Sequence, residues 1–284
     1  MKLAIESYHT WKKLGIEGCI RKLKETGFDA VDWSFYWDAA PALCGEDYIE
    51  KAKEIRDCLK KYGLSCNQAH APFDLLWDMP REDSCFEYLS VKRAIEAAGI
   101  IGIDHIVVHG LAVPETAVSE RNLALNYEYY KTLEPYAAKA GVKIAVENLS
   151  GAFTYPDLMN QMLERLDSPN FVGLVDVGHA WLRANMQPGL FLRRVKHGTV
   201  KGLHIQDNHG IARGIDEHIM PYSATVDFDD LAKALVEIGY DGDFTLELPR
   251  FLEMYGEHGL LDPALTFAQA VGRKMIADID ALKK

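Results

Sequence analysis

The sequence lacks the features that mark membrane and secreted proteins. None of its apolar runs approaches the roughly 18 consecutive apolar residues that a membrane-spanning helix needs. The charged residues Lys2 and Glu6 stand too early for a secretory signal peptide. We therefore expect a cytoplasmic protein without a membrane segment.

Cysteine and dense positive charge are also scarce. The five cysteines lie in the first third of the chain, form no CxxC pair, and occupy positions 19, 44, 58, 66 and 85. An odd, scattered set favours reduced thiols in a cytoplasmic protein over a disulfide framework. The formal net charge is −11, and no run of Lys or Arg is dense. This balance argues against a broad nucleic-acid-binding surface.

What is present is the composition of a globular protein, with 48% hydrophobic and 26% charged residues. The 284 residues contain no low-complexity linker and no shift in composition. We therefore expect a single domain that covers residues 1–284. A chain of this length is long enough for one (β/α)-barrel.

Apolar strand-like segments alternate with amphipathic helix-like segments along the whole chain. The predicted strands cover 3–8, 28–35, 64–71, 105–109, 142–147, 171–176, 200–206 and 243–248. The predicted helices cover 11–26, 48–62, 84–98, 119–139, 156–166, 188–197, 228–238 and 263–282. Eight such units predict an α/β fold, the (β/α)₈ TIM barrel. A doubly wound sheet is the alternative, but no GxGxxG follows the first predicted strand.

Barrel enzymes keep their active sites at the C-terminal ends of the strands. Ionisable or metal-binding residues stand at or just after the ends of the third to eighth predicted strands: His70, His109, Glu147, Asp176, His179, His204, Asp207, Asn208, Asp216, His218 and Glu247. Singly, each could cap a helix or form an ion pair; Asp176, for example, could equally cap the next helix. A full circuit of such residues predicts a functional site.

Four of these residues, Glu147, Asp176, His204 and Glu247, come from the last four predicted strands. Three carboxylates and an imidazole form an oxygen-rich ligand set, for which we expect one Mn²⁺, with Mg²⁺, Co²⁺ or Zn²⁺ as alternatives. A cation with open positions can hold both oxygens of a hydroxy-ketone and stabilise the enediolate that forms when a proton leaves. Glu147 and Glu247 are the candidate acid–base pair.

These residues stand in motifs that resemble the xylose isomerase-like TIM-barrel superfamily, specifically its sugar phosphate isomerase/epimerase and endonuclease IV branch. The matching motifs are His70-Ala71-Pro72, Val108-His109, Ala145-Val146-Glu147-Asn148, Val175-Asp176-Val177-Gly178-His179, Leu203-His204-Ile205-Gln206-Asp207-Asn208, Asp216-Glu217-His218-Ile219-Met220-Pro221 and Leu246-Glu247. Their order and spacing are specific for the superfamily, but they do not name a substrate.

The resemblance to the ketose 3-epimerases implies one divalent cation on the four residues named above, with the two glutamates exchanging the proton. It also implies that His179 contacts the oxygens of a sugar or polyol. Further candidate substrate contacts are His70, His109, Asp207, Arg213, His218 and Trp181. The epimerases carry a substrate-binding Arg near the position of Gly210, where this chain has none. Either Arg213 substitutes from a shifted loop, or the substrate is held differently.

The resemblance to endonuclease IV implies a different activity, an abasic-site nuclease with three zinc ions. Compatible residues stand at all nine of its ligand positions: His70, His109, Glu147, Asp176, His179, His204, Asp216, His218 and Glu247. The N-terminal third lacks Gly- and Asn-rich DNA-contacting loops, and the acidic balance fits a small polyol better than a nucleic acid.

Two further functions remain open: a dehydratase of an inosose- or dehydroshikimate-like ketone, and a non-catalytic sugar-binding barrel, which would not need both glutamates. Aromatic residues follow the second strand or lie in predicted rim loops, where they could contact a sugar, pack under the loops or serve a homo-oligomer: Trp33, Phe35, Trp37, Trp77 and Trp181. We expect His105 and His197 to be surface or helix-end histidines.

Overall fold

The computed structural model describes residues 1–35, 41–73, 76–111, 120–149 and 151–284. Trp37 and the first residue of the helix predicted at 119–139 lie outside these ranges. Among the described helices, none is both long and apolar enough to cross a membrane.

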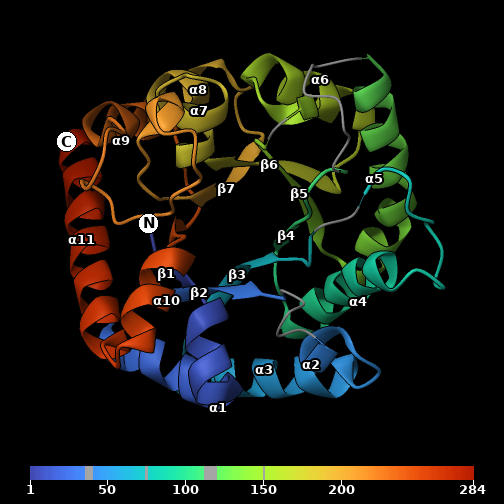
Figure 1. Ribbon diagram of the computed structural model, residues 1–284, viewed down its shortest axis with the longest axis horizontal. Coiled ribbons are helices and arrows are strands. Elements are labelled where there is room, and N and C mark those ends of the chain that lie inside the picture. Colours follow the sequence, from blue (N-terminus) through green and yellow to red (C-terminus); the bar gives the residue numbers. More distant parts are fainter. Residues whose placement is uncertain (36–40, 74–75, 112–119, 150) are drawn as a thin grey trace.

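Eight parallel strands form the barrel, which confirms the predicted TIM-barrel fold (Figure 1). The strands are β1 (Leu3–Glu6), β2 (Ala30–Ser34), β3 (Ser65–His70), β4 (His105–Val107), β5 (Lys143–Glu147), β6 (Phe171–Asp176), β7 (Val200–His204) and β8 (Phe244–Leu246). From β1 to β7 each strand pairs with the next strand in the sequence, and β1 also pairs with β8. A parallel bridge between Ile205 and Leu246 closes the circle between β7 and β8.

Helices surround the strands in chain order, so that the last long helix packs beside the first (Figure 1). They are α1 (Tyr8–Thr26), α2 (Pro41–Cys44), α3 (Tyr48–Tyr62), α4 (Phe86–Ile101), α5 (Glu120–Ala140), α6 (Pro156–Leu166), α7 (Val177–Arg183), α8 (Pro188–Arg194), α9 (Phe228–Glu237), α10 (Pro249–Glu257) and α11 (Leu261–Leu282). The described chain also forms the 3₁₀ helices η1 (Gly151–Phe153) and η2 (Gly210–Ala212).

Local sequence signals explain the helix ends that were predicted to the residue. Gly63 ends α3 with a φ of 65°, a left-handed conformation that other residues rarely adopt. Pro156 begins α6, where its missing N–H costs no helical hydrogen bond. The short helices α2, α7 and α10 were not predicted. Trp181 therefore lies in α7 and not in a loop, because α7 begins directly after β6.

The interior of the barrel is divided between apolar and polar side chains. On β4, β5 and β6, a small apolar cluster of Val107, Ala145, Val172 and Leu174 fills it. On β1 to β4, Glu6, Asp32, Gln68 and His105 are buried at successive register partners. The prediction of His105 as a surface residue was therefore wrong, because its strand directs it toward Gln68, 3.1 Å away. His197 is exposed, as predicted.

The aromatic residues Trp33 and Phe35, at the end of the second predicted strand, are part of the core. Trp33 and Phe35 are buried at 0% and 1% exposure, so they pack under the rim instead of facing solvent. Trp77 and Trp181 are half-buried and pack against the main hydrophobic core.

Candidate active site

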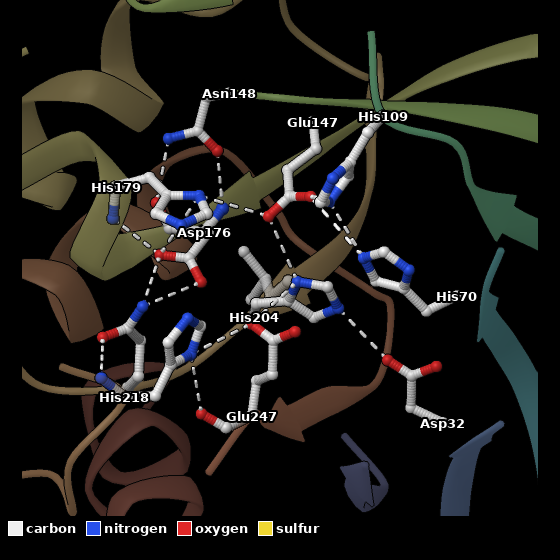
Figure 2. Close-up of polar contacts among 12 residues, drawn as sticks. Asp32, His70, His109, Glu147, Asn148, Asp176, His179, His204, His218 and Glu247 are labelled. Atoms are coloured by element: carbon white, nitrogen blue, oxygen red, sulfur yellow. Dashed lines mark hydrogen bonds and ion pairs between the residues drawn. The ribbon is translucent and has the colours of Figure 1, made fainter. Parts of the chain in front are cut away.

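The ends of β5 to β8 bring four side chains together at one end of the barrel. Glu147, Asp176, His204 and Glu247 are all buried, and one potential ligand atom from each lies within 4.8 Å of the others. Parallel strands produce this arrangement because their C-terminal ends meet at one rim; Asp176 and His204 are direct register partners. Figure 2 shows these side chains pointing toward a common space.

His204 is the centre of this group. Its Nδ1 lies 3.2 Å from Glu247 Oε2 and 3.4 Å from Glu147 Oε1. Its other ring nitrogen, Nε2, lies 3.1 Å from Asp32 Oδ2, and Figure 2 shows this contact. The imidazole therefore contacts a carboxylate with each nitrogen.

Asp176 serves two purposes that sequence alone presented as alternatives. Its Oδ1 accepts the backbone N–H of His179 at 2.6 Å, which caps α7. Both of its carboxylate oxygens lie 3.3 Å from the Gln206 amide nitrogen. Its backbone is held by Asn148, whose side chain accepts the Asp176 N–H and donates to its carbonyl. The cap thus fixes a carboxylate that also belongs to the four-residue cluster.

A second cluster adjoins the first through Glu147. His109 Nε2 lies 2.8 Å from Glu147 Oε2 and 3.0 Å from His70 Nε2. Because a carbonyl only accepts, His70 Nδ1 donates to the Ala71 carbonyl at 2.8 Å, which leaves its Nε2 with a lone pair. Burial and the nearby His109 lower the pKa of His70 to about 3, so this ring is neutral.

A third cluster joins His179, in the first turn of α7, to the loop after β7. His179 Nε2 lies 2.8 Å from Asp216 Oδ2, and His218 Nε2 lies 3.3 Å from Asp216 Oδ1. The potential ligand atoms of these three residues, like those of the second cluster, lie within 4.8 Å of one another.

The donor atoms fit a cation. Glu147 Oε2, Glu247 Oε2 and His179 Nδ1 are buried, and their nearest described polar neighbours are other ionisable groups of the clusters: His109 Nε2 lies 2.8 Å from Glu147 Oε2, His204 Nδ1 lies 3.2 Å from Glu247 Oε2, and His179 Nδ1 lies 3.3 Å from Glu147 Oε1. Crowding several buried ionisable groups together is costly, and coordination to a cation would reduce that cost. The set combines carboxylate and imidazole, the donors that suit Mn²⁺, Mg²⁺, Co²⁺ and Zn²⁺.

The pKa values of the two glutamates are shifted in opposite directions. Burial would raise the pKa of Glu147, but the surrounding His109, His179 and His204 outweigh it and hold that pKa well below its usual range. Burial also acts on Glu247 and there prevails, raising its pKa to about 8. A pair of carboxyl groups whose pKa values are separated in this way is suited to act as base and acid.

A cavity of about 510 Å³ lies above the clusters. Glu147 and Glu247 line it together with His70, His109, His179 and His218, while Tyr8, Phe73 and Pro249 add apolar walls. Lys12 and Arg250 lie at the same cavity and are exposed. This volume lies within the range of small-ligand sites.

Three predicted substrate contacts lie away from this cavity. Asp207 is buried and accepts backbone N–H groups of Ala224 and Val226, so it holds the loop after β7. Arg213 is exposed and pairs with Glu217 at 2.6 Å. The Trp181 indole donates to Thr225 Oγ1 at 2.9 Å. None of the three lines the cavity.

Sequence reasoning missed two buried carboxylates, Glu6 on β1 and Asp32 on β2. Burial raises the pKa of Glu6 to about 7, a hydrogen bond from the Tyr8 backbone opposes the shift, and the nearby Asp32 adds to it. The available signal was an acidic residue inside an apolar strand, as in Ala30-Val31-Asp32-Trp33. Such a residue must have a buried partner.

Comparisons with known proteins agree with this architecture. The family model described as "Xylose isomerase-like TIM barrel" matches residues 20–270. The chain is 25% identical over 275 residues to the uncharacterized protein y4fM of Sinorhizobium fredii, covering 86% of this chain and 84% of that protein.

Two solved structures share the fold over their whole lengths. A D-tagatose 3-epimerase-like protein superposes with a TM-score of 0.75 at 21% identity, covering 100% of both chains. The IolI protein, solved with a bound zinc atom, has a TM-score of 0.75 at 17% identity and covers 100% of this chain and 99% of its own.

Proposed function

The chain belongs to the family of xylose isomerase-like TIM barrels, and we propose that it is a divalent-metal-dependent sugar isomerase or epimerase. One observation carries the proposal: Glu147 and Glu247 belong to the four-residue cluster and also line the cavity. The same two carboxyl groups can therefore hold a cation and reach a substrate. One structural neighbour is a D-tagatose 3-epimerase-like protein, which supports the choice of substrate class.

Glu147, Asp176, His204 and Glu247 would hold the cation, for which Mn²⁺ is our first expectation. When bound, it supplies Lewis-acid stabilisation of the negative charge that develops on a substrate oxygen. The zinc atom in the neighbouring IolI structure supports a divalent cation in this type of barrel.

The proton transfers fall to the two glutamates. Glu147 and Glu247 would be the acid–base partners: one removes a proton from the carbon beside the carbonyl, and the other returns a proton. His70, His109, His179 and His218 line the same cavity and orient the hydroxyl groups of the sugar.

We also propose a cytoplasmic location, because the five cysteines are all free thiols in the structure.

The test combines metal analysis with a panel of ketoses and inososes in D₂O. We expect about one divalent ion per chain and deuterium uptake into one of these sugars. Glu247→Gln should abolish the uptake, whereas Glu253→Gln should keep it, because that residue lies at the cavity but is exposed. Protein that binds no divalent metal would contradict the proposal.

One observation favours a second candidate, an abasic-site nuclease. Three adjoining residue sets are each suited to a metal ion, and Glu147 is shared by two of them. Three zinc ions per chain together with incision of a duplex that contains an abasic site would establish this activity. One ion per chain and an intact duplex would exclude it.

A further inference from the structure

A row of polar side chains lies inside the barrel, directly beneath the proposed cation site. Gln68 Nε2 donates to Asp32 Oδ2 at 2.7 Å, and Asp32 Oδ2 lies 3.1 Å from His204 Nε2. On the other side, His105 Nε2 lies 3.1 Å from Gln68 Oε1. All four side chains are buried. They link the interior of β4 to the histidine at the end of β7.

The chemistry of the groups fixes the direction of each hydrogen bond. Gln68 turns its NH₂ toward Asp32 Oδ2, which accepts the hydrogen bond, and its carbonyl oxygen therefore faces His105. His105 Nε2 then donates to that oxygen. By the same reasoning His204 Nε2 donates to Asp32, which directs Nδ1 toward Glu147 and Glu247.

The row is anchored at the opposite end of the barrel. His105 Nδ1 lies 3.2 Å from Asp104 Oδ2, and Lys143 Nζ lies 2.8 Å from the other oxygen of that carboxylate. Asp104 directly precedes β4, at the N-terminal ends of the strands. The row therefore extends from a surface ion pair to the proposed site.

Two features show that the barrel is built around this row. The facing residue on β7 is Gly202, where a Cβ would approach Gln68 Oε1 to 2.6 Å and His105 Nε2 to 2.9 Å. The other half of the interior is filled by the apolar cluster of Val107, Ala145, Val172 and Leu174. Burying polar groups instead is costly unless they are hydrogen-bonded; in this row Asp32 Oδ2 accepts two hydrogen bonds, while Asp32 Oδ1 has no partner among the described residues.

We propose that Asp32 is a positioning residue for the cation site, and that Gln68 and His105 hold Asp32 in place. By accepting the Nε2–H of His204, Asp32 fixes the ring so that Nδ1 faces the cation. A carboxylate partner on the second nitrogen is a general means of orienting a metal-binding histidine. The inference rests on the cation site proposed above.

The test compares Asp32→Ala and Asp32→Asn with the control Asn67→Ala. Asn67 precedes Gln68 in β3 but donates to Asp243 at 2.8 Å, outside the row. The Mn²⁺ dissociation constant, measured by competition with a chelating dye, should rise about 10- to 100-fold in Asp32→Ala. Asp32→Asn should lose less affinity, because its amide oxygen can still accept from His204. The control should bind like the wild type.

A second readout does not depend on metal binding. In the metal-free protein, the NMR signal of the His204 Nε2–H should be shifted downfield by the bond to Asp32, and Asp32→Ala should abolish that shift. If Asp32→Ala does not fold, Asp32→Asn and Gln68→Ala provide both readouts. A folded Asp32 variant with wild-type Mn²⁺ affinity and an unchanged His204 signal would overturn the inference. Wild-type protein that binds no metal would overturn the proposed function, while the NMR comparison would still test the contact.

Discussion

Strands β5 to β8 and strands β1 to β4 contribute differently to the same site. The first group supplies the cluster of Glu147, Asp176, His204 and Glu247 at its strand ends. The second group supplies His70 and His109 at the rim, but it also supplies Asp32, Gln68 and His105, which lie inside the barrel and, among the described residues, reach the cluster through His204. The comparison separates residues that would contact the cation or the substrate from residues that orient those side chains. Substitutions in the two groups should therefore have different effects.

The largest effect should come from removing a member of the first group. His204→Ala deletes the nitrogen that faces both glutamates, so its loss of metal affinity should exceed the about 10- to 100-fold cost of losing an outer partner. Metal content after dialysis, measured by mass spectrometry, checks this. His197→Ala, at an exposed histidine, is the control. Full metal occupancy in His204→Ala would contradict the assignment of His204 as a cation ligand and the distinction between ligands and positioning residues.

The second prediction concerns Glu6, which neighbours Asp32 in the second group. Its pKa is raised from 4.5 to about 7 in the folded protein. Folded protein therefore binds the proton more tightly than unfolded protein, and the resulting stabilisation, present below pH 4.5, is lost as the pH rises through 7. The loss amounts to about 3 kcal/mol. Glu6→Gln should remove this pH-dependent loss of stability, because the Gln side chain does not ionise.

Urea unfolding of metal-free wild type and Glu6→Gln at acidic and alkaline pH measures this difference. The variant should gain stability relative to the wild type as the pH rises. An equal difference between the two proteins at both pH values would contradict the prediction.

The third prediction tests the space that β7 leaves for the polar row. Gly202→Ala should destabilise the protein by about 1–3 kcal/mol, because the added methyl group overlaps Gln68 and His105. Gly256→Ala is the matched control: it lies in α10, nothing lies within 4 Å of its Cβ position, and it should be neutral or stabilising. Thermal unfolding of both variants checks the contrast. If Gly202→Ala leaves the stability unchanged, Gln68 and His105 can move aside without a loss of free energy of unfolding.

The smallest effect should come from an ion pair outside both groups. Arg193 on α8 lies 2.9 Å from Asp230 and 2.5 Å from Glu237, both on α9. These side chains are 30–54% exposed, so solvent screens the pair and Arg193→Ala should cost about 0.2–1 kcal/mol. Chemical unfolding and a Mn²⁺ titration should show this small cost and an unchanged affinity. A loss of affinity would show that the outer helices also position the site.

Much of the fold could be predicted because its signals are local. The segments 48–62, 156–166 and 171–176 were predicted to the residue, since glycine, proline and apolar runs mark their ends. α7 was missed because it is short and begins without a break after β6. A seven-residue helix has too few turns for a periodic pattern to appear.

The strand-end residues could be predicted because barrel geometry brings every strand end to one rim. Arg213, Asp207 and Trp181 follow strand ends closely in sequence, but the chain directs them away from the cavity. His105 belongs to a strand of three residues, which is too short to reveal the face of each side chain. The contact of Asp32 with His204 joins positions 172 residues apart, and only the closed barrel brings them together.

The bridge between Ile205 and Leu246 has a consequence for motion in the barrel. It is the seam of the cylinder, and His204 and Glu247 are the immediate chain neighbours of its two residues. Ile205 donates to the Thr245 carbonyl at 2.8 Å, and Glu247 donates to the Ile205 carbonyl at 3.0 Å. If the hydrogen bonds between β7 and β8 opened, His204 and Glu247 would move apart. A cation bound to both side chains would therefore stabilise the closed barrel. The amide protons of Ile205 and Glu247 should therefore exchange with solvent more slowly once a cation is bound.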